Sequence, residues 1–470
     1  MKRPRRVAAS ITSIPAEIIQ HIALFIPDTK GFFSFLASFQ DAKRSEALGE
    51  LSHFLKLAKI LEGADLWPKL QLRLLRPLLI PTLRCVTRFF TTIYVLHVHN
   101  AGLIKRCLHD HNVVELLDSP SHSYLDQWLT ESVSMLPVQH ITFNSPSERS
   151  TALLVDQLDK MPHLVSLNLR RTNILLRDFD RLLAFIQARS TFSRLCLSTL
   201  HVPTQIQRRP NWIRGVEPLH RPPRLYRHQL DLLKEWLSRS RATSIKLRRW
   251  HVDDDGVASG VKLLHAIFAS STLESASLTT ASLGPLIAMT KLRVPLRMQL
   301  LDLSDNLIDD TAMMSLAKGL RDSNIKSLNL GENNIGHCGM SALLDVLPTT
   351  KMQKLRLRCM YLDDSTCQAI AAVLPSTKIA DLDLSDNNLT DRTAEALATA
   401  VGRATSLTSL HLYRNVISLH GASVLVNALS RRGQVTTWLD LGANFFHSND
   451  KKYLHDMVHK SAQILKANFE

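Results

Sequence analysis

The sequence lacks the features that mark membrane-spanning, secreted and disulfide-stapled proteins. It has no run of about 18 or more apolar residues, so it predicts no transmembrane helix. Its six cysteines are scattered without a paired spacing, which favours reduced thiols in a cytoplasmic or nuclear protein. The basic start, Met1 to Arg6, is followed by Glu17 and His21, which interrupt the apolar segment that a secretory signal needs.

The sequence also lacks the usual marks of catalysis. No glycine-rich phosphate loop, Ser-His-Asp order, paired Cys-His set or cluster with metal-ligand spacing is present. His97, His99, His109 and His111 lie close together, but no cysteine or acidic set completes a zinc pattern, and surface histidines at alternating strand positions are the better explanation. We therefore predict that the chain is not an enzyme and uses no cofactor or metal ion.

What the sequence does contain is one phrase that returns between Met298 and Phe446. Its copies are Leu301 to Ile308, Leu328 to Ile335, Leu355 to Leu362, Leu382 to Leu389, Leu410 to Ile417 and Leu439 to Phe446. Each unit opens three residues before the phrase, as at Met298. Its ninth residue is Asn306, Asn333, Met360, Asn387, Asn415 or Asn444, at intervals of 27 to 29 residues. A fixed period with the spacing L-x-x-L-x-L-x-x-N-x-L is typical of a leucine-rich repeat solenoid.

Each unit predicts one strand followed by one helix. Alternating apolar residues such as Leu301 and Leu303 favour a short strand with one buried face, and Thr311 to Leu320 follows helical spacing. An asparagine at the ninth position can satisfy backbone groups of the turn and of the neighbouring coil. These units resemble the ribonuclease-inhibitor type of leucine-rich repeat. The resemblance implies an α/β horseshoe with a curved parallel sheet on the concave face, helices on the convex face, and a protein gripped by the sheet.

The rest of the chain divides around this solenoid. We predict a disordered basic tail over residues 1–10, a helical region over 11–90, the solenoid over 91–446, and a C-terminal capping helix over 447–470. A wide gap between weak repeats opening at Phe192 and Ala242 marks an insertion at about 203–226, rich in proline and arginine. Its prolines predict an irregular surface loop. Its arginines suit carboxylate or phosphate recognition, although a solubilising loop without a ligand has the same composition.

The helical region carries a second resemblance. Its first helix is predicted from the spacing of Ile14, Pro15, Glu17, Ile18, Ile22 and Phe25. The end of the region is marked by Leu66, Trp67 and Leu70. These residues resemble an F-box, although the family's middle Val-Ser-Lys-x-Trp phrase is missing. The resemblance implies that the six residues of the first helix bind the adaptor subunit of a cullin-RING ubiquitin ligase. A helical cap over the open edge of the first repeat is the alternative.

Side chains between the buried strand leucines are expected on the exposed face of the sheet. The candidate partner-binding residues there are Arg170, Arg171, Lys246, Arg248, Arg249, Arg356, Arg358, Asp383, His411, Tyr413, Arg414 and Trp438. Lys354, Arg356 and Arg358 lie between acidic rows of neighbouring units, so partial neutralisation by ion pairs is expected. Tyr413 and Trp438 are aromatics of the kind that anchor interfaces, although packing against the C-terminal cap would also explain them.

We therefore predict a protein-binding scaffold, in its sharper form the substrate-recognition subunit of a cullin-RING ligase. The alternatives are a plain interaction scaffold and a GTPase regulator resembling the Ran GTPase-activating proteins, which are built from similar repeats. A net charge of +15 favours acidic partners. Sparse aromatics near the arginines disfavour nucleic acid. We expect no membrane contact, and a monomer apart from its partners.

Overall fold

The computed structural model describes residues 15–39, 45–202, 223–239, 241–292 and 294–470. It forms two compact units, Met1–Asp178 and Phe179–Glu470, which are described separately below. The predicted basic tail, Ile14 and most of the predicted insertion lie outside the described residues. No helix in the described ranges is long and apolar enough to cross a membrane.

The first unit begins with short helices and continues as a parallel sheet with connecting helices. The helical region contains α1 (Ala16–Leu24), α2 (Thr29–Ala37), α3 (Ser52–Leu57) and α4 (Gly63–Leu66). The strands follow in the order β1 (Gln71–Leu72), β2 (Thr92–Val95), β3 (Val113–Leu116), β4 (Val138–Asn144) and β5 (Ser166–Arg170). The helices between them are α5 (Ile80–Thr87), α6 (Ala101–Cys107), α7 (His122–Gln127) and α8 (Glu148–Gln157).

An aromatic cluster joins the helical region to the first repeat of this unit. Trp67 stacks on Phe32 with ring centroids 4.3 Å apart, and Phe54 and Phe90 pack around the pair. The Trp67 indole donates to the Ile26 carbonyl at 2.6 Å, which satisfies its one polar group. Because Phe90 lies just before β2, the short helices share a core with the start of the sheet.

In the second unit, parallel strands and helices alternate along the chain. Its main sheet runs in the order β6 (Arg194–Ser198), β8 (Ser244–Arg248), β10 (Ser275–Thr279), β11 (Leu300–Asp302), β12 (Ser327–Asn329), β13 (Lys354–Arg356), β14 (Asp381–Asp383), β15 (Ser409–His411), β16 (Trp438–Asp440) and β17 (Ala467–Asn468). Successive strand leucines such as Leu301, Leu328 and Leu355 are aligned and fully buried. Consecutive repeats therefore share one continuous core.

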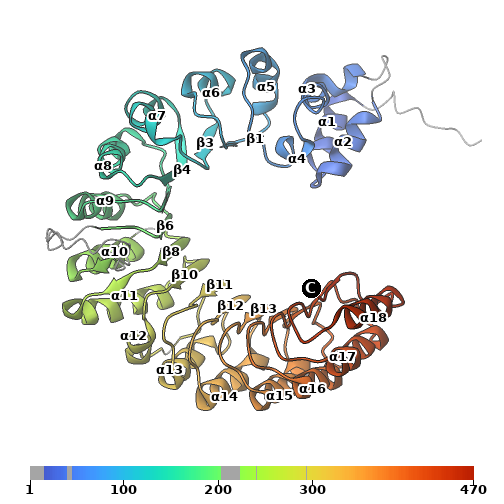
Figure 1. Ribbon diagram of the computed structural model, residues 1–470. Helices are drawn as coiled ribbons and strands as arrows, with labels where there is room; N and C mark the ends of the chain where they lie inside the picture. The colour runs from blue at the N-terminus through green and yellow to red at the C-terminus, as the bar shows by residue number, and fades with distance from the viewer. Residues whose placement is uncertain (1–14, 40–44, 203–222, 240, 293) are drawn as a thin grey trace, which may run out of the picture. The chain divides into compact units, whose positions relative to one another are not determined.

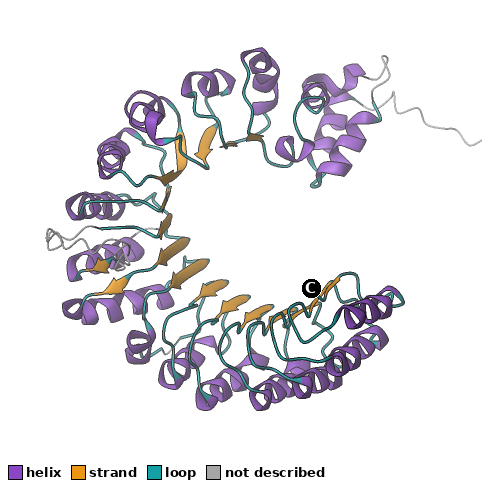
Figure 2. Ribbon diagram, in the orientation of Figure 1, coloured by secondary structure: helices purple, strands orange, loops and turns teal. Residues whose placement is uncertain are grey.

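The helices of this unit cover one side of the sheet and leave the other side open (Figures 1 and 2). They are α9 (Leu176–Ala188), α10 (Arg227–Arg239), α11 (Val257–Ala269), α12 (Gly284–Met289), α13 (Asp310–Leu320), α14 (His337–Val346), α15 (Asp364–Val373), α16 (Asp391–Val401), α17 (Leu419–Arg431) and α18 (Ser448–His459). The division between the two units falls near the start of α9. We call the open side of this sheet the strand face.

The ninth-position asparagines form a hydrogen-bonded spine between neighbouring coils. Asn387 is 5% exposed, and its Oδ1 accepts from the Met360 and Leu362 amides of the preceding coil, both at 3.0 Å. Its Nδ2 donates to the Leu357 carbonyl at 3.0 Å and to Leu384 of its own coil at 2.9 Å. One amide group thus satisfies buried backbone of two coils, as the sequence predicted.

The turn that leads to this spine has the same backbone in most repeats of the two units, the repeats of β3 and β4 excepted. The eighth residue takes a left-handed conformation, with φ between 46 and 62° at His97, Arg171, Thr199, Arg249, Thr280, Asp305, Glu332, Cys359, Asp386, Arg414 and Ala443. L residues adopt this conformation at a cost of about 1–2 kcal/mol. The shared conformation shows that the irregular early repeats and the regular late ones turn at the same position.

Aspartates at helix starts link neighbouring helices on the opposite side of the sheet. Asp364 accepts from the Thr390 amide at 2.9 Å and from the Thr393 hydroxyl at 2.6 Å. Asp391 accepts from the amide and the hydroxyl of Ser418 at 2.7 and 2.6 Å. Burial opposes ionisation of Asp364, but these hydrogen bonds outweigh it and lower the pKa of the carboxyl.

Two segments differ from the predicted boundaries. After α18 the chain does not end as a helix but returns to the sheet as β17, which pairs with β16. Near the insertion, residues Arg224–Leu225 form strand β7 beside β9 (His251–Val252), within the range expected to be an irregular loop. The described side chains explain this pairing, because Leu225 is buried and Arg224 contacts Asp253 at 2.9 Å.

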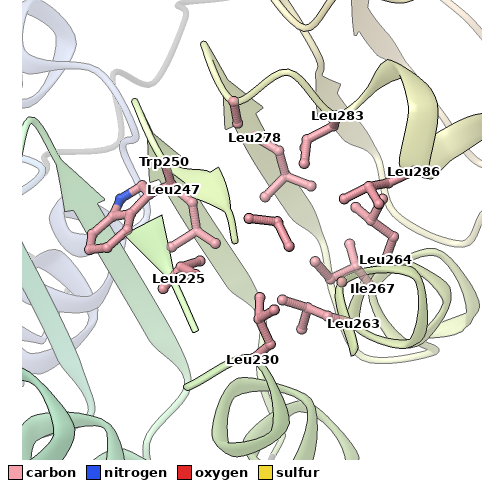
Figure 3. A pocket seen from close by; sticks show the side chains of 13 residues that line it. Leu225, Leu230, Leu247, Trp250, Leu263, Leu264, Ile267, Leu278, Leu283 and Leu286 are labelled. Atoms are coloured by element: carbon pink, nitrogen blue, oxygen red, sulfur yellow. The ribbon is translucent and has the colours of Figure 1, made fainter. Parts of the chain in front are cut away.

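A small apolar cavity lies under β7 and β8, against α11. Its volume is about 30 Å³, and its lining residues, which include Leu225, Trp250, Leu264 and Leu286, are apolar (Figure 3). A cavity of this size has room for about one water molecule but offers it no polar partners. We interpret it as a packing defect in the core and not as a ligand site.

Candidate binding surface of the parallel sheet

The repeat determines which side chains reach the strand face. Counting from the apolar residue that opens each repeat, the third, fifth and seventh side chains alternate with buried leucines, and the left-handed eighth residue follows. In the second unit the predicted partner-binding residues occupy these positions: Lys246, Arg248, Arg249, Arg356, Arg358, Asp383, His411, Tyr413, Arg414 and Trp438. Arg170 and Arg171 occupy the same positions in the first unit, on and just after β5, and both are exposed.

Asp381 links three neighbouring strands of the strand face. Its carboxylate lies 3.2 Å from the Lys354 Nζ on β13 and 3.3 Å from the His411 Nε2 on β15. The hydrogen bond from His411 lowers the pKa of Asp381, and the same bond raises the pKa of His411. The His411 side chain is 28% exposed, so solvent weakens this coupling.

Asp386 forms a second bridge beyond the strand ends. It lies 2.6 Å from the Arg358 Nε and 3.5 Å from the Arg414 Nη1. Two predicted partner-binding arginines therefore share one carboxylate within the chain. Arg356, on β13 two residues before Arg358, is exposed and aligned with Asp383, and it makes no ion pair with any described residue.

Asp383 accepts a hydrogen bond from the backbone of its own turn. One of its oxygens accepts from the Ser385 amide at 3.0 Å. The same local bond recurs in other repeats: Asp302 to Ser304, Asn329 to Gly331 and Asp440 to Gly442. The predicted binding residue Asp383 thus belongs to a repeated turn, and it is aligned with Arg356 of β13.

The two predicted aromatic anchors are both half-buried. Trp438 lines an open hollow of about 410 Å³ together with His455, Ile464 and Ala467 of the C-terminal segment. Tyr413 lies against Gly442, where any side chain would meet its ring and the Glu470 carbonyl. The structure therefore brings Trp438 to the C-terminal segment, as the alternative explanation of this residue expected.

The basic residues of β8 have a different environment. Lys246, Arg248 and Arg249 are exposed, and none forms an ion pair with a described residue. The strands on either side present Cys196 and Ser198 on β6, and Ser277 and Thr279 on β10. We call Lys246, Arg248 and Arg249 the β8 basic patch.

The predicted adaptor-binding residues of the first unit lie on and beside α1. Ile18, Ile22 and Phe25 are 50%, 44% and 82% exposed, whereas Ile19 and Ala23 of the same helix are buried. Pro15 precedes the helix and Glu17 lies in its first turn. The helix thus packs one apolar face and leaves a second apolar face open.

Two of the four neighbouring histidines noted in the sequence contact a carboxylate that the sequence did not point to. Asp118 lies 2.8 Å from the His97 Nδ1 and 3.5 Å from the His99 Nε2. His109 and His111 instead stack on one another, 5.7 Å apart. Within the described ranges, no group of three or more His, Cys, Asp or Glu side chains is arranged to hold a metal ion.

Comparisons with known proteins identify the repeat. The family model described as Leucine Rich repeat matches residues 321–344 and 376–398. An internalin (inlF) from Listeria monocytogenes is a similar solved structure, with 15% sequence identity and a TM-score of 0.33 over 88% of this chain and 97% of that chain. A search of curated proteins returns no match. The matched segments lie within the repeating strand, turn and helix of the second unit, which has the α/β fold of a leucine-rich repeat solenoid.

Proposed function

We propose that this chain is a scaffold that binds a protein partner on the strand face of its second unit. The observation that carries the proposal is the row of charged side chains from Lys246 to Arg414 on an open parallel sheet. Exposed ion pairs contribute at most about 1 kcal/mol each, so stability alone does not account for such a row. Charged and aromatic side chains on a rigid surface are suited to recognising another protein.

Site-specific photo-crosslinking tests this proposal. A photoreactive residue at Arg356 on the strand face should capture a discrete partner from a native extract, whereas the same residue at Arg392 on the exposed side of α16 should not. Both positions are exposed arginines, so the pair is matched in charge and accessibility. Equal capture at the two positions, or capture at Arg392 alone, would remove the strand face as the binding surface.

A second proposal concerns the open face of α1. Ile18, Ile22 and Phe25 expose apolar surface on one side of a helix, which is the arrangement that the F-box resemblance requires for binding a ligase adaptor. Ile18→Asp combined with Ile22→Asp should abolish co-purification with the adaptor. Ile60→Asp is a matched control, because Ile60 is 54% exposed elsewhere in the first unit. If the unaltered chain fails to bind the adaptor, α1 serves the fold alone and the ligase role is withdrawn.

We further propose that the chain works in the cytoplasm or nucleus as a monomer apart from its partners. All six cysteines are free, which suits a reducing compartment. Light scattering of the purified chain tests the monomer, and a dimer at low micromolar concentration would contradict it.

A further inference from the structure

Two strands of the second unit carry the same charge pattern in opposite surroundings. Both contain the sequence Lys-Leu-Arg, at the fifth to seventh positions of the β8 repeat (Lys246 and Arg248) and at the third to fifth positions of the β13 repeat (Lys354 and Arg356). A further arginine follows each, Arg249 after β8 and Arg358 after β13. The β14 repeat supplies carboxylates to the basic residues of the β13 repeat. Asp381 and Asp386 lie within ion-pair distance of Lys354 and Arg358, and Asp383 is aligned with Arg356. The positive charge of β13 is therefore balanced within the protein.

The β8 basic patch has no such balance. Lys246 is aligned with Cys196 on one side and Ser277 on the other, and Arg248 is aligned with Ser198 and Thr279. Beyond β10, the residue of β11 that is aligned with Ser277 is Asp302. Its oxygens already accept from the Ser277 hydroxyl at 3.4 Å and the Ser304 hydroxyl at 2.9 Å.

The geometry of the patch suits one compact anion. Lys246 and Arg248 lie two residues apart on the same face of the strand, a separation of about 7 Å along the backbone. Their long side chains can converge on one group, and Arg249 follows directly in the left-handed turn. The neighbouring hydroxyl of Ser198 is half-exposed, so it can supply a further donor.

We propose that the β8 basic patch binds a phosphorylated serine or threonine in a segment of the protein partner. This inference rests on the proposed function, because it names the chemistry of the partner that the strand face binds. A phosphate monoester carries about two negative charges and three acceptor oxygens. A guanidinium can donate to two of these oxygens at once, and the Lys246 ammonium with the Ser198 hydroxyl can donate to the third. A carboxylate has one charge and would leave several of these donors unused.

Peptide binding to the full chain tests the proposal. The probes are three degenerate peptide libraries that differ only in a fixed central residue, which is phosphoserine, serine or glutamate. The phosphoserine library should bind at least about tenfold more tightly than the other two, since serine brings no charge and glutamate brings one charge and fewer acceptor oxygens. Equal binding of the phosphoserine and glutamate libraries would overturn the specificity for phosphate.

Matched variants locate the site. Lys246→Ser with Arg248→Ser should reduce phosphopeptide affinity by about tenfold or more, whereas Arg392→Ser with Arg403→Ser, on and just after α16 and outside the strand face, should change it less than about twofold. Both doubles remove two positive charges from exposed positions, and unchanged thermal unfolding verifies that each folds. An equal loss in both variants would assign the binding to general charge and contradict the proposal.

Two further outcomes separate the inference from the function beneath it. A single-stranded DNA probe that binds more tightly than the phosphopeptides, with the same loss in the β8 double, would assign the patch to nucleic acid and overturn the inference. If photo-crosslinking at Arg356 captures a partner while the phosphoserine library fails, the scaffold function stands and this inference falls. If the library binds through β8 while crosslinking fails, the inference stands and the partner surface lies away from Arg356.

Discussion

Two stretches of the second unit build the same coil in different ways. From Met298 onward, a buried asparagine at the ninth position ties most coils to their neighbours through backbone hydrogen bonds. In the repeats that open at Phe192, Ala242 and Leu273, the ninth residues are Leu200, Trp250 and Ala281, and all three are buried. The turn geometry is nevertheless the same in both stretches, because the eighth residue is left-handed throughout.

Trp250 shows how packing replaces the amide in the earlier stretch. It stacks on Phe179 with centroids 5.1 Å apart, and its Nε1 donates to the Leu197 carbonyl at 3.4 Å, where an asparagine would donate in a later repeat. The carbonyl of Pro223, just before β7, accepts from the His251 amide at 3.0 Å. This packing leaves the small cavity that Trp250 lines. A coil of this type can thus be closed by apolar packing or by amide hydrogen bonds.

The largest expected effect is on the packed stretch. Trp250→Ala removes a side chain that is 2% exposed, and it enlarges a cavity that already exists. We expect the free energy of unfolding to fall by about 3–5 kcal/mol. Urea denaturation measures it, and Trp250→Phe should retain most of the stability because it keeps the stack. A loss below about 1 kcal/mol in the alanine variant would show that packing does not close this coil.

The matching change in the hydrogen-bonded stretch is Asn387→Ala. It leaves the amides of Met360 and Leu362 and the carbonyl of Leu357 without their partner. Each unpaired buried group costs about 1–3 kcal/mol, so we expect a loss of about 3 kcal/mol. Asn388→Ala is the control, since this neighbouring asparagine is exposed. Equal effects of the two alanine variants in urea denaturation would contradict a structural role for the spine.

A substitution that adds spine hydrogen bonds is the converse test of Asn387→Ala. Met360 occupies the ninth position of a late repeat, and the preceding Asn333 and Ile335 amides have no acceptor among the described residues. Met360→Asn should supply one, and should raise the free energy of unfolding by about 1 kcal/mol after loss of the apolar side chain. Thermal and urea denaturation measure the change. A loss as large as that of Met360→Ala would show that packing governs this position.

The smallest expected effect concerns pH. The pKa of His411 is raised above 6.5 by its bond to Asp381, so the pair stabilises the fold fully below pH 6.5 and loses that contribution as pH rises through the raised value. The carboxyl of Asp381 has a lowered pKa, so its own contribution is present above 3.8 and is lost as pH falls through the lowered value. Because both groups are partly exposed, we expect less than about 1 kcal/mol.

Unfolding of the chain and of His411→Gln at about pH 6 and pH 8 measures this contribution. The stability difference between the two proteins should shrink on going to the higher pH. A difference that grows with pH would contradict the assigned direction.

The sequence predicted the late repeats well because their spine uses one residue type at a fixed spacing. It predicted the strand-face positions for the same reason, since alternation with buried leucines determines which side chains are exposed. The early repeats were harder to detect, because Leu200, Trp250 and Ala281 share only burial.

Other features depended on pairing between distant segments. The ribbon of β7 and β9 and the return of β17 to the sheet have no local pattern, and the packing of Trp438 depends on that return. The aspartates that link helices were also missed. Their signal was in the sequence, where Asp364 and Asp391 each precede a Thr or Ser cap in the next unit by 26 or 27 residues.

Amide hydrogen exchange on the unaltered chain tests most directly whether the asparagine spine seals the coils. Ile308, Leu362 and Leu389 occupy equivalent positions to Ile335, and each donates to the asparagine of the next coil at 3.0–3.2 Å. We expect these three amides to be strongly protected and the Ile335 amide, which faces Met360, to exchange at least about tenfold faster. Equal protection of all four amides would show that the coils are sealed without the asparagines.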